Sequence, residues 1–154
     1  LYNYPVESHV YVMDRKSGEQ KVFEADSRFT KNVAEKCESG NYEQWERHNI
    51  ENPHFYDLMY LPQTGMYARL HLGGIEFDAT RDILNLMDDR DLYLTFFDKD
   101  FVVVGEAKLP SHRYNYFTGW RETNDGVALF VDNSLDENEK TEELVLDIVR
   151  LQAD

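Results

Sequence analysis

The strongest constraint on the fold is a period of two in the segment 66–72. Apolar side chains occupy every second position: Met66, Ala68, Leu70 and Leu72. The positions between them hold Tyr67, Arg69 and His71. An amphipathic helix would need apolar residues three and four positions apart, so this alternation predicts a β-strand. A slip of one residue would exchange the two faces, and the register of this strand is therefore well specified.

Further segments rich in β-branched and aromatic residues recur along the chain, mostly in pairs separated by turn residues. We predict strands near 9–14, 20–24, 55–61, 66–72, 92–98, 101–107, 114–121, 127–132 and 144–151. Gly18 and the Asn124-Asp125-Gly126 tripeptide are typical of tight hairpins. A short helical turn is expected within 80–89, and the last run, 144–151, also fits an amphipathic helix, although its β-branched content favours a strand.

Grouped in fours, these strands predict an all-β fold of antiparallel four-stranded meanders, a partial β-propeller. Residues 1–26 would form the outer hairpin of one blade, and 27–54 a long connecting insertion with one or two helical turns. Residues 55–110 would form a complete blade and 111–154 a last, incomplete one, giving about two and a half blades. The strand groups repeat at about 60 residues, which is longer than the ~40–50 of a typical blade. The same strands also permit a β-sandwich.

Such a chain would leave sheet edges and blade faces uncovered. A blade buries its faces against its neighbours, so the expected partner is the rest of a parent propeller. Pairing of open edges with a second copy, giving a homo-oligomer, is the other expectation. The first residues, Leu1 to Val6, lack an initiating Met and the features of a signal peptide, and they read as a chain already in progress.

Composition excludes several classes of function. The formal net charge of −14 disfavours sequence-independent binding to nucleic acid or anionic lipid, which requires basic patches. A single cysteine, Cys37, rules out an intrachain disulfide framework. No apolar run reaches the ~18 residues of a membrane-spanning helix.

A family resemblance follows from motifs spread over most of the chain. They are Val10-Tyr11-Val12-Met13-Asp14, Ser27-Arg28-Phe29, Phe55-Tyr56-Asp57, Tyr67-Ala68-Arg69-Leu70, Leu94-Thr95-Phe96-Phe97-Asp98 with Gly105-Glu106, Asp125-Gly126-Val127 and Leu146-Asp147-Ile148-Val149-Arg150-Leu151. The chain resembles the C-terminal half of an uncharacterised family of bacterial six-bladed, TolB-like β-propeller lipoproteins. The resemblance implies a six-bladed ring, export to the cell envelope and a lipid-anchored N-terminus. It implies no reaction and no catalytic residues.

The candidate ligand-binding residues are Tyr67, Arg69, His71 and Trp120. On an inner propeller strand, the first three would face the central channel and bind an anionic or carbohydrate ligand, with Trp120 and Trp45 as stacking platforms. The favoured alternative is a structural role for these residues, in salt bridges and aromatic packing between blades.

No other motif identifies chemistry. His48, His54 and His71, with Cys37, lack the spacing of a zinc site, so we predict no metal and no cofactor. The Asp98-Lys99-Asp100 segment lacks the glycine and closing Glu of a calcium loop and is expected to form a turn. No nucleophile motif is present. The function predicted is a non-catalytic binding or scaffolding propeller of the bacterial envelope that recognises a protein or carbohydrate. The alternative is a hydrolase or lyase that acts on a glycan or peptide at the central channel.

Overall fold

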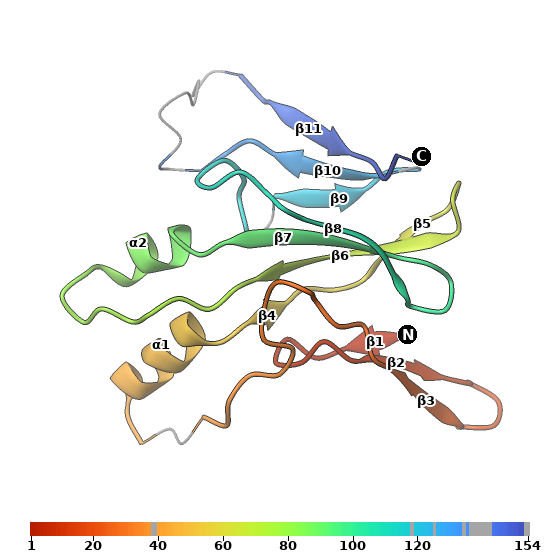
Figure 1. Cartoon of the computed structure of the whole chain (residues 1–154), viewed down its shortest axis with the longest axis horizontal. Helices are drawn as coiled ribbons and strands as arrows, with labels where there is room; N and C mark the ends of the chain where they lie inside the picture. The colour runs from red at the N-terminus through yellow and green to blue at the C-terminus, as the bar shows by residue number, and fades with distance from the viewer. Residues whose placement is uncertain (38–39, 118, 125, 134, 136–142, 153–154) are drawn as a thin grey trace.

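The computed structural model describes residues 1–37, 40–117, 119–124, 126–133, 135 and 143–152. The described residues contain eleven strands and two helices, and every strand pairing is antiparallel. The prediction of an all-β, antiparallel fold is therefore confirmed. The strands form three sheets, numbered here in chain order, which lie one above another (Figure 1).

The three sheets follow the chain. Sheet 1 has the order β1-β2-β3, from β1 (Tyr2–Asn3), β2 (Val10–Met13) and β3 (Gln20–Phe23). Sheet 2 has the order β4-β6-β7-β8, with β5 also paired to β6; its strands are β4 (His54–Phe55), β5 (Met59–Leu61), β6 (Met66–Leu72), β7 (Leu92–Phe97) and β8 (Val103–Lys108). Sheet 3 has the order β9-β10-β11, from β9 (Trp120–Glu122), β10 (Val127–Phe130) and β11 (Leu146–Val149).

Sheet 2 forms the middle layer, and both of its faces are buried. The apolar face of β6 and β7 packs against Val127 and Leu129 of sheet 3. On the opposite face, Phe97 packs with Val10 of sheet 1 and with Phe101. The alternation predicted for 66–72 is thus correct, and its polar positions face a second layer of protein.

Two helices lie at one end of the sheets (Figure 1). Helix α1 (Tyr42–Glu51) begins at Asn41, whose side chain accepts a hydrogen bond from the backbone N–H of Gln44. Such a cap satisfies one of the backbone donors that the first helical turn leaves unpaired. Helix α2 (Ile83–Asp88) follows β6 and lies within the predicted segment 80–89. Ile75 donates its N–H to the carbonyl of Ile50, which ties the chain after β6 to the end of α1.

Three strand predictions need correction. The predicted strand 55–61 is divided into β4 and β5, because the chain leaves the β6 ladder between them and Asn3 bonds the carbonyl of Tyr56. The predicted strand 114–121 reduces to β9 and an isolated bridge between Tyr114 and Val131. Strand β1 was missed, because two residues are too few to show a period.

Turn predictions agree where they can be compared. Gly18 has a φ of 73°, the left-handed conformation expected in the β2–β3 turn. In the Asp98-Lys99-Asp100 segment, the Asp98 carboxylate accepts backbone N–H groups of Asp100 and Val102, as a turn requires. Asp125 of the predicted Asn124-Asp125-Gly126 turn and residues 136–142 lie outside the described residues.

Candidate functional site

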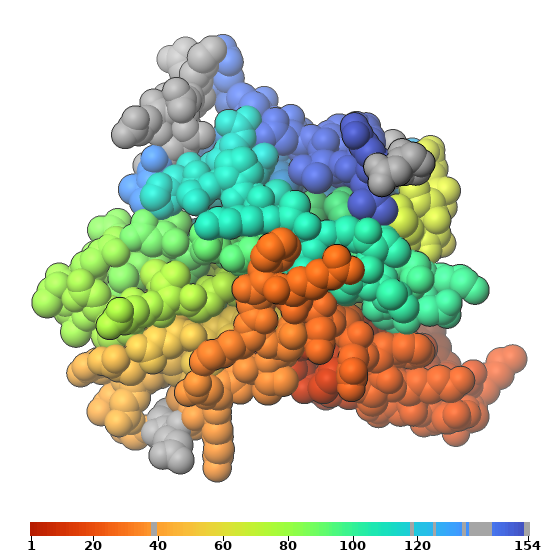
Figure 2. All heavy atoms as spheres, in the orientation of Figure 1, coloured from red at the N-terminus to blue at the C-terminus, as the bar shows by residue number. Residues whose placement is uncertain are grey.

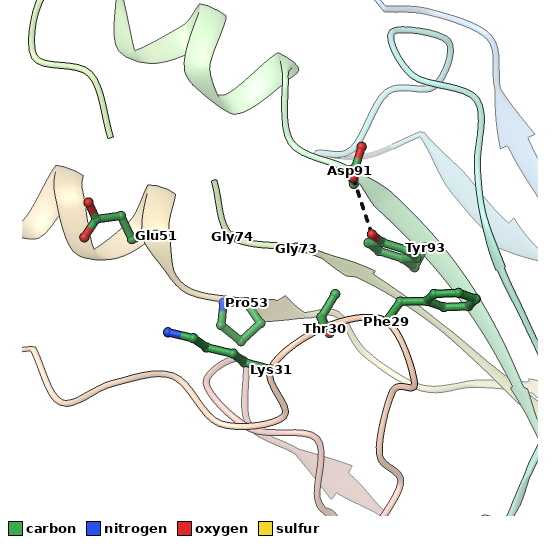
Figure 3. A pocket seen from close by; sticks show the side chains of 9 residues that line it. All are labelled: Phe29, Thr30, Lys31, Glu51, Pro53, Gly73, Gly74, Asp91 and Tyr93. Atoms are coloured by element: carbon green, nitrogen blue, oxygen red, sulfur yellow. Dashed lines mark hydrogen bonds between the residues drawn. The ribbon is translucent and has the colours of Figure 1, made fainter. Parts of the chain in front are cut away.

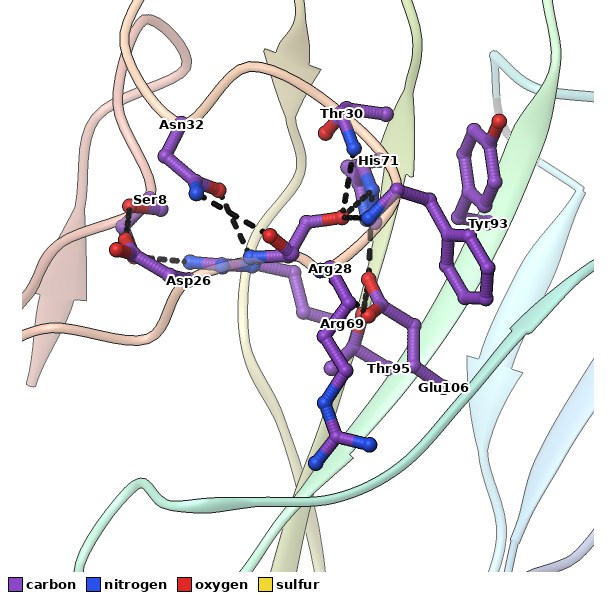
Figure 4. A network of polar contacts seen from close by, with 12 residues as sticks. Ser8, Asp26, Arg28, Thr30, Asn32, Arg69, His71, Tyr93, Thr95 and Glu106 are labelled. Carbon is purple, nitrogen blue, oxygen red and sulfur yellow. Dashed lines mark hydrogen bonds and ion pairs between the residues drawn. The ribbon is translucent and has the colours of Figure 1, made fainter.

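The face of sheet 2 that meets sheet 1 carries a sealed polar cluster, centred on Arg69, His71 and Glu106 (Figure 4). Arg69 is 1% exposed, and its guanidinium donates to the carbonyl of Ser8 at 2.8 Å and that of Ala25 at 2.7 Å. It lies over the rings of Phe55 and Phe97, at 4.7 and 5.2 Å from their centroids. Burial lowers the pKa of Arg69 to about 10, so it stays charged at neutral pH.

His71 is enclosed between two aromatic rings. Phe55 and Tyr93 stack on its two sides, with centroid distances of 5.3 and 5.0 Å. Its Nε2 lies 3.1 Å from Ser27 Oγ and 3.8 Å from a carboxylate oxygen of Glu106. Burial, together with the charge of Arg69, lowers the pKa of His71 to about 3. The imidazole is therefore neutral at any physiological pH.

Glu106 completes the cluster from β8. Its side chain is 1% exposed and accepts hydrogen bonds from Thr95 Oγ1 at 3.1 Å and from the backbone N–H of Arg28 at 2.8 Å. The second bond holds the connection after β3 across sheet 2, where Figure 2 shows this orange segment lying over the teal strands. The sealed polar cluster therefore fastens a long connection and sheet 1 to sheet 2.

The structure separates the four residues predicted to bind a ligand. Tyr67, Arg69 and His71 share the face toward sheet 1, where Tyr67 packs against Phe101. Trp120 lies in the opposite layer and packs on Tyr56, with ring centroids 4.5 Å apart. Arg69 and His71 make polar contacts and aromatic stacking between layers, as expected if their role is structural. Ligand binding by the four residues stays a prediction.

A small polar pocket of about 180 Å³ lies beside this cluster (Figure 3). Its walls are Phe29, Thr30, Lys31, Glu51, Pro53, Gly73, Gly74, Asp91 and Tyr93. The charged groups among them are paired elsewhere: Lys31 with Glu35, Glu51 with Arg47, and Asp91 with Lys108. The pocket therefore offers few groups to a ligand.

A larger cleft of about 360 Å³ opens between α1 and α2. We call it the aromatic cleft. It is lined by Tyr42, Trp45, Glu46, Asn49, His54, Tyr56, Leu72, Ile83, Met87, Arg90 and Phe117. Its volume lies at the lower end of the range of about 300–1,000 Å³ that is typical of small-molecule sites.

Helix α1 supplies one wall of the aromatic cleft. Tyr42, Trp45, Glu46 and Asn49 stand at positions i, i+3, i+4 and i+7 and therefore share one face of the helix. The rings of Tyr42 and Trp45 stack with a centroid distance of 5.6 Å and an interplanar angle of 28°. Sequence reasoning named Trp45 but missed the face, because the segment was read as a connection.

Arg90 forms part of the floor of the aromatic cleft without offering a free charge. It is 5% exposed, and its guanidinium donates to the carbonyls of Gly73, Asn49 and Asn52 at 2.8, 2.8 and 2.6 Å. Burial lowers its pKa to about 10. These carbonyls belong to the end of β6 and of α1, so Arg90 holds two walls of the cleft together.

His54 and Tyr56 form the opposite wall. Their rings meet edge to face at a centroid distance of 4.8 Å. Burial, and then the charge of Arg90, lowers the pKa of His54, so the imidazole is neutral at pH 7. A neutral imidazole carries one donor and one acceptor nitrogen. Burial also raises the pKa of the Tyr56 phenol, which stays protonated as a donor.

Within the described ranges, no three His, Cys, Asp or Glu side chains gather closely enough to hold a metal ion. His48 and His71 are engaged separately, His48 with the carbonyl of Glu35 and His71 within the sealed polar cluster. No helix among the described residues is long and apolar enough to cross a membrane.

The fold and the stacked sheets define an all-β protein built from antiparallel strands in chain order. The chain belongs to the DUF4221 family, a domain of unknown function, whose family model matches residues 1–108. This match confirms that the chain belongs to an uncharacterised family. No curated protein matches the sequence.

A solved structure extends the similarity beyond the family match. It is the crystal structure of a member of the DUF4221 family from Bacteroides vulgatus, with a TM-score of 0.74 and 18% sequence identity. The match covers 97% of this chain and 45% of that chain. The sequence therefore spans less than half the length of the protein it matches, and the likeness establishes the fold alone.

Proposed function

We propose that the chain contributes consecutive blades to a six-bladed, TolB-like β-propeller. Three antiparallel sheets follow one another in the described chain and stack face to face, as blades do. The length of the matched protein supports a six-bladed ring. Three sheets would occupy 45% of that protein, so its full length has room for six or seven sheets.

The two outer faces of the stack support the same proposal. On sheet 3, Leu146 and Ile148 are about half exposed, and Leu144, just before β11, is 77% exposed. At sheet 1, Val22 of β3 is about half exposed, and so is Tyr4, whose ring contacts Tyr11 of β2. Contiguous exposed apolar side chains indicate a surface that another part of the protein covers. We expect a neighbouring blade on each face.

A structure of the complete protein tests the ring. We expect sheets 1 and 3 each to be covered by a further four-stranded sheet. If the outer faces instead meet a second copy of the same chain, light scattering will report a homo-oligomer, and the single-chain ring is wrong.

We infer that the protein is a non-catalytic binding module whose ligand occupies the aromatic cleft. The observation that carries this inference is the stacked, exposed pair Tyr42 and Trp45 at the mouth of a cavity of ligand size. An enzyme needs a convergent set of titratable groups with perturbed pKa values in an open pocket. Arg69 and His71, whose pKa values are strongly lowered, are enclosed by protein. The pKa values of His54, Tyr56 and Arg90 are also shifted and these residues line the aromatic cleft, where Arg90 is bound to three backbone carbonyls.

The alternative, a hydrolase or lyase acting on a glycan or peptide, predicts turnover. The test incubates the complete protein with pools of oligosaccharides and of peptides, then measures both retention and cleavage by mass spectrometry. A binding module returns its ligand intact. Cleavage that stops in Glu46→Gln, the variant that removes the carboxylate of the cleft, would establish the enzyme instead.

We also propose that the parent protein resides in the bacterial envelope as a lipoprotein, on the resemblance described above. Fractionation of cells with an antibody against the chain tests this placement. Recovery with the membrane fraction, with release by detergent, is expected, and recovery in the soluble cytoplasmic fraction contradicts it.

A further inference from the structure

We propose that the aromatic cleft binds a neutral saccharide, with one sugar ring stacked on Trp45. This inference rests on the proposed binding function and assigns the ligand class to the same site. It follows from the charge of the cleft, the geometry of its rings, and the polar groups that line it.

The charges that line the cleft favour a ligand without net charge. Arg90 contributes one positive charge and Glu46 one negative charge, and His54 is neutral. The guanidinium of Arg90 is already occupied by three backbone carbonyls, so it offers no fork to a carboxylate or phosphate. A cationic ligand would meet the buried charge of Arg90 in a site of low dielectric. A neutral ligand meets neither penalty.

The stacked pair provides a platform suited to a sugar ring. Tyr42 is 70% exposed and Trp45 is 51% exposed, so their rings are open to solvent although they stack on each other. The face of an aromatic ring is electronegative. The C–H groups on one side of a pyranose are weakly electropositive and form a flat apolar surface, which fits that face.

Four further groups of the cleft are free to bind hydroxyls. The carboxylate of Glu46, the ring of His54 and the phenol of Tyr56 make no hydrogen bond to the described part of the chain. The side-chain N–H₂ of Asn49 bonds the carbonyl of Trp45, which leaves its amide oxygen for a ligand. Together these groups supply both donors and acceptors. Sugar hydroxyls need both, because each hydroxyl donates and accepts.

An apolar peptide is the competing ligand, and it fits less well. Burying Glu46, His54 and Tyr56 under apolar side chains would leave their polar atoms unpaired. Each unpaired polar group would weaken the binding of the peptide. A sugar satisfies these groups while it covers the rings, so the same contacts that penalise the peptide favour the saccharide.

The experiment titrates the complete protein with individual probes and follows binding by calorimetry. The neutral probes are cellopentaose, maltopentaose, mannopentaose and xylopentaose. The competing probes are an oligogalacturonate, a chitosan oligomer and a leucine-rich peptide. We expect at least one neutral oligosaccharide to bind, and the charged and apolar probes to bind at least tenfold more weakly.

Variants locate the binding. Trp45→Ala is expected to weaken the oligosaccharide about tenfold, and Trp45→Phe, which keeps an aromatic face, should recover most of the loss. Tyr60→Ala removes an aromatic side chain of similar exposure outside the cleft, and it is the matched control, expected to leave affinity unchanged.

Each contrary result overturns a defined part of the inference. Oligosaccharide binding that survives Trp45→Ala overturns the assignment to the cleft. Binding of the peptide alone, lost in Trp45→Ala, overturns the saccharide while the proposed binding function at the cleft stands. If none of the probes binds, the saccharide inference is wrong, and the ring is still judged by the structure of the complete protein.

Discussion

Two arginine–histidine pairs of the described residues lie in similar chemical settings, but only one pair borders an open cleft. Arg69 and His71 lie between sheets 1 and 2, and Arg90 and His54 lie at the aromatic cleft. Both arginines donate to backbone carbonyls, and each lowers the pKa of its histidine. In each pair the arginine fastens the backbone. Only the second pair lines the aromatic cleft, whose volume is about 360 Å³.

The difference shows why residue type alone does not locate a binding site. Arg69 and His71 attract attention in the sequence because they stand on a strand among apolar residues. Their hydrogen-bond partners are Ser8, Ala25 and Ser27, which come from the opposite layer. Arg69 Nε and His71 Nδ1 have no hydrogen-bond partner among the described residues, but they are enclosed by protein. Ligand recognition requires groups that a ligand can reach, and α1 and β4 present such groups at the aromatic cleft.

The largest expected loss of stability comes from a substitution that disrupts the sealed polar cluster. Arg69→Ala leaves two backbone carbonyls without a donor and the buried Glu106 without a nearby positive charge. Removing one member of a buried ionic group typically costs about 3–5 kcal/mol. We expect a fall of that size in the free energy of unfolding, measured by urea denaturation of the complete protein.

Arg69→Met is the control for this variant, because it fills the space without a charge. It should lose less than Arg69→Ala, since the apolar side chain keeps the packing on Phe55 and Phe97. A change below about 1 kcal/mol for Arg69→Ala would contradict the structural role of the cluster.

The next largest effect is the pH dependence of stability that His71 causes. The folded-state pKa of His71 is about 3, below its ordinary value of 6.5, so the unfolded chain binds a proton that the folded chain does not. The stability due to neutral His71 is fully present above pH 6.5 and is lost as pH falls toward 3. Between pH 6.5 and 4, the loss amounts to about 3 kcal/mol.

His71→Phe isolates this contribution. The phenyl ring retains the stack between Phe55 and Tyr93 but does not titrate. The difference in unfolding free energy between wild type and His71→Phe should therefore shift in favour of the variant as pH falls from 6.5 to 4. A pH-independent difference would show that His71 takes up its proton as readily in the folded protein as in the unfolded chain, and would contradict the lowered pKa.

A smaller effect is expected where α1 meets the end of β6. A Cβ added at Gly74 would overlap the backbone carbonyl of Glu51, at the end of α1. The backbone must shift to admit it, at a typical cost of about 1–3 kcal/mol. Gly74→Ala should lower stability by that amount and also weaken any ligand of the aromatic cleft, since α1 forms one wall. Gly18→Ala adds its Cβ in open space and tests the strain of a positive φ alone.

The sequence allowed prediction of the sheets but not of the site, for a physical reason. Strand β6 was predicted with its correct bounds because a period of two is a local property. The predicted strand ends at Leu72, yet the need for glycine at position 74 comes from Glu51, a residue distant in sequence. Long-range contacts of this kind leave no periodic signal.

The aromatic cleft shows the same limit more strongly. The residues that line the cleft come from segments with no predicted role in a site. The predicted connection 27–54 contains Tyr42, Trp45 and His54, and the predicted strand 114–121 contains Phe117. The helical face on α1 was visible in principle, since Tyr42, Trp45 and Asn49 are spaced at three and four residues. Its partners across the cleft were not, because α2 and β4 approach it only in the folded chain.

The smallest expected effect concerns Trp45 and completes the contrast with Arg69. Its side chain is half exposed and its main ring contact is the exposed Tyr42, so little buried area depends on it. Trp45→Ala should change the free energy of unfolding by less than about 1 kcal/mol. A variant that retains stability while it loses a ligand assigns the residue to recognition, whereas a loss comparable to that of Arg69→Ala would make the platform part of the structural core.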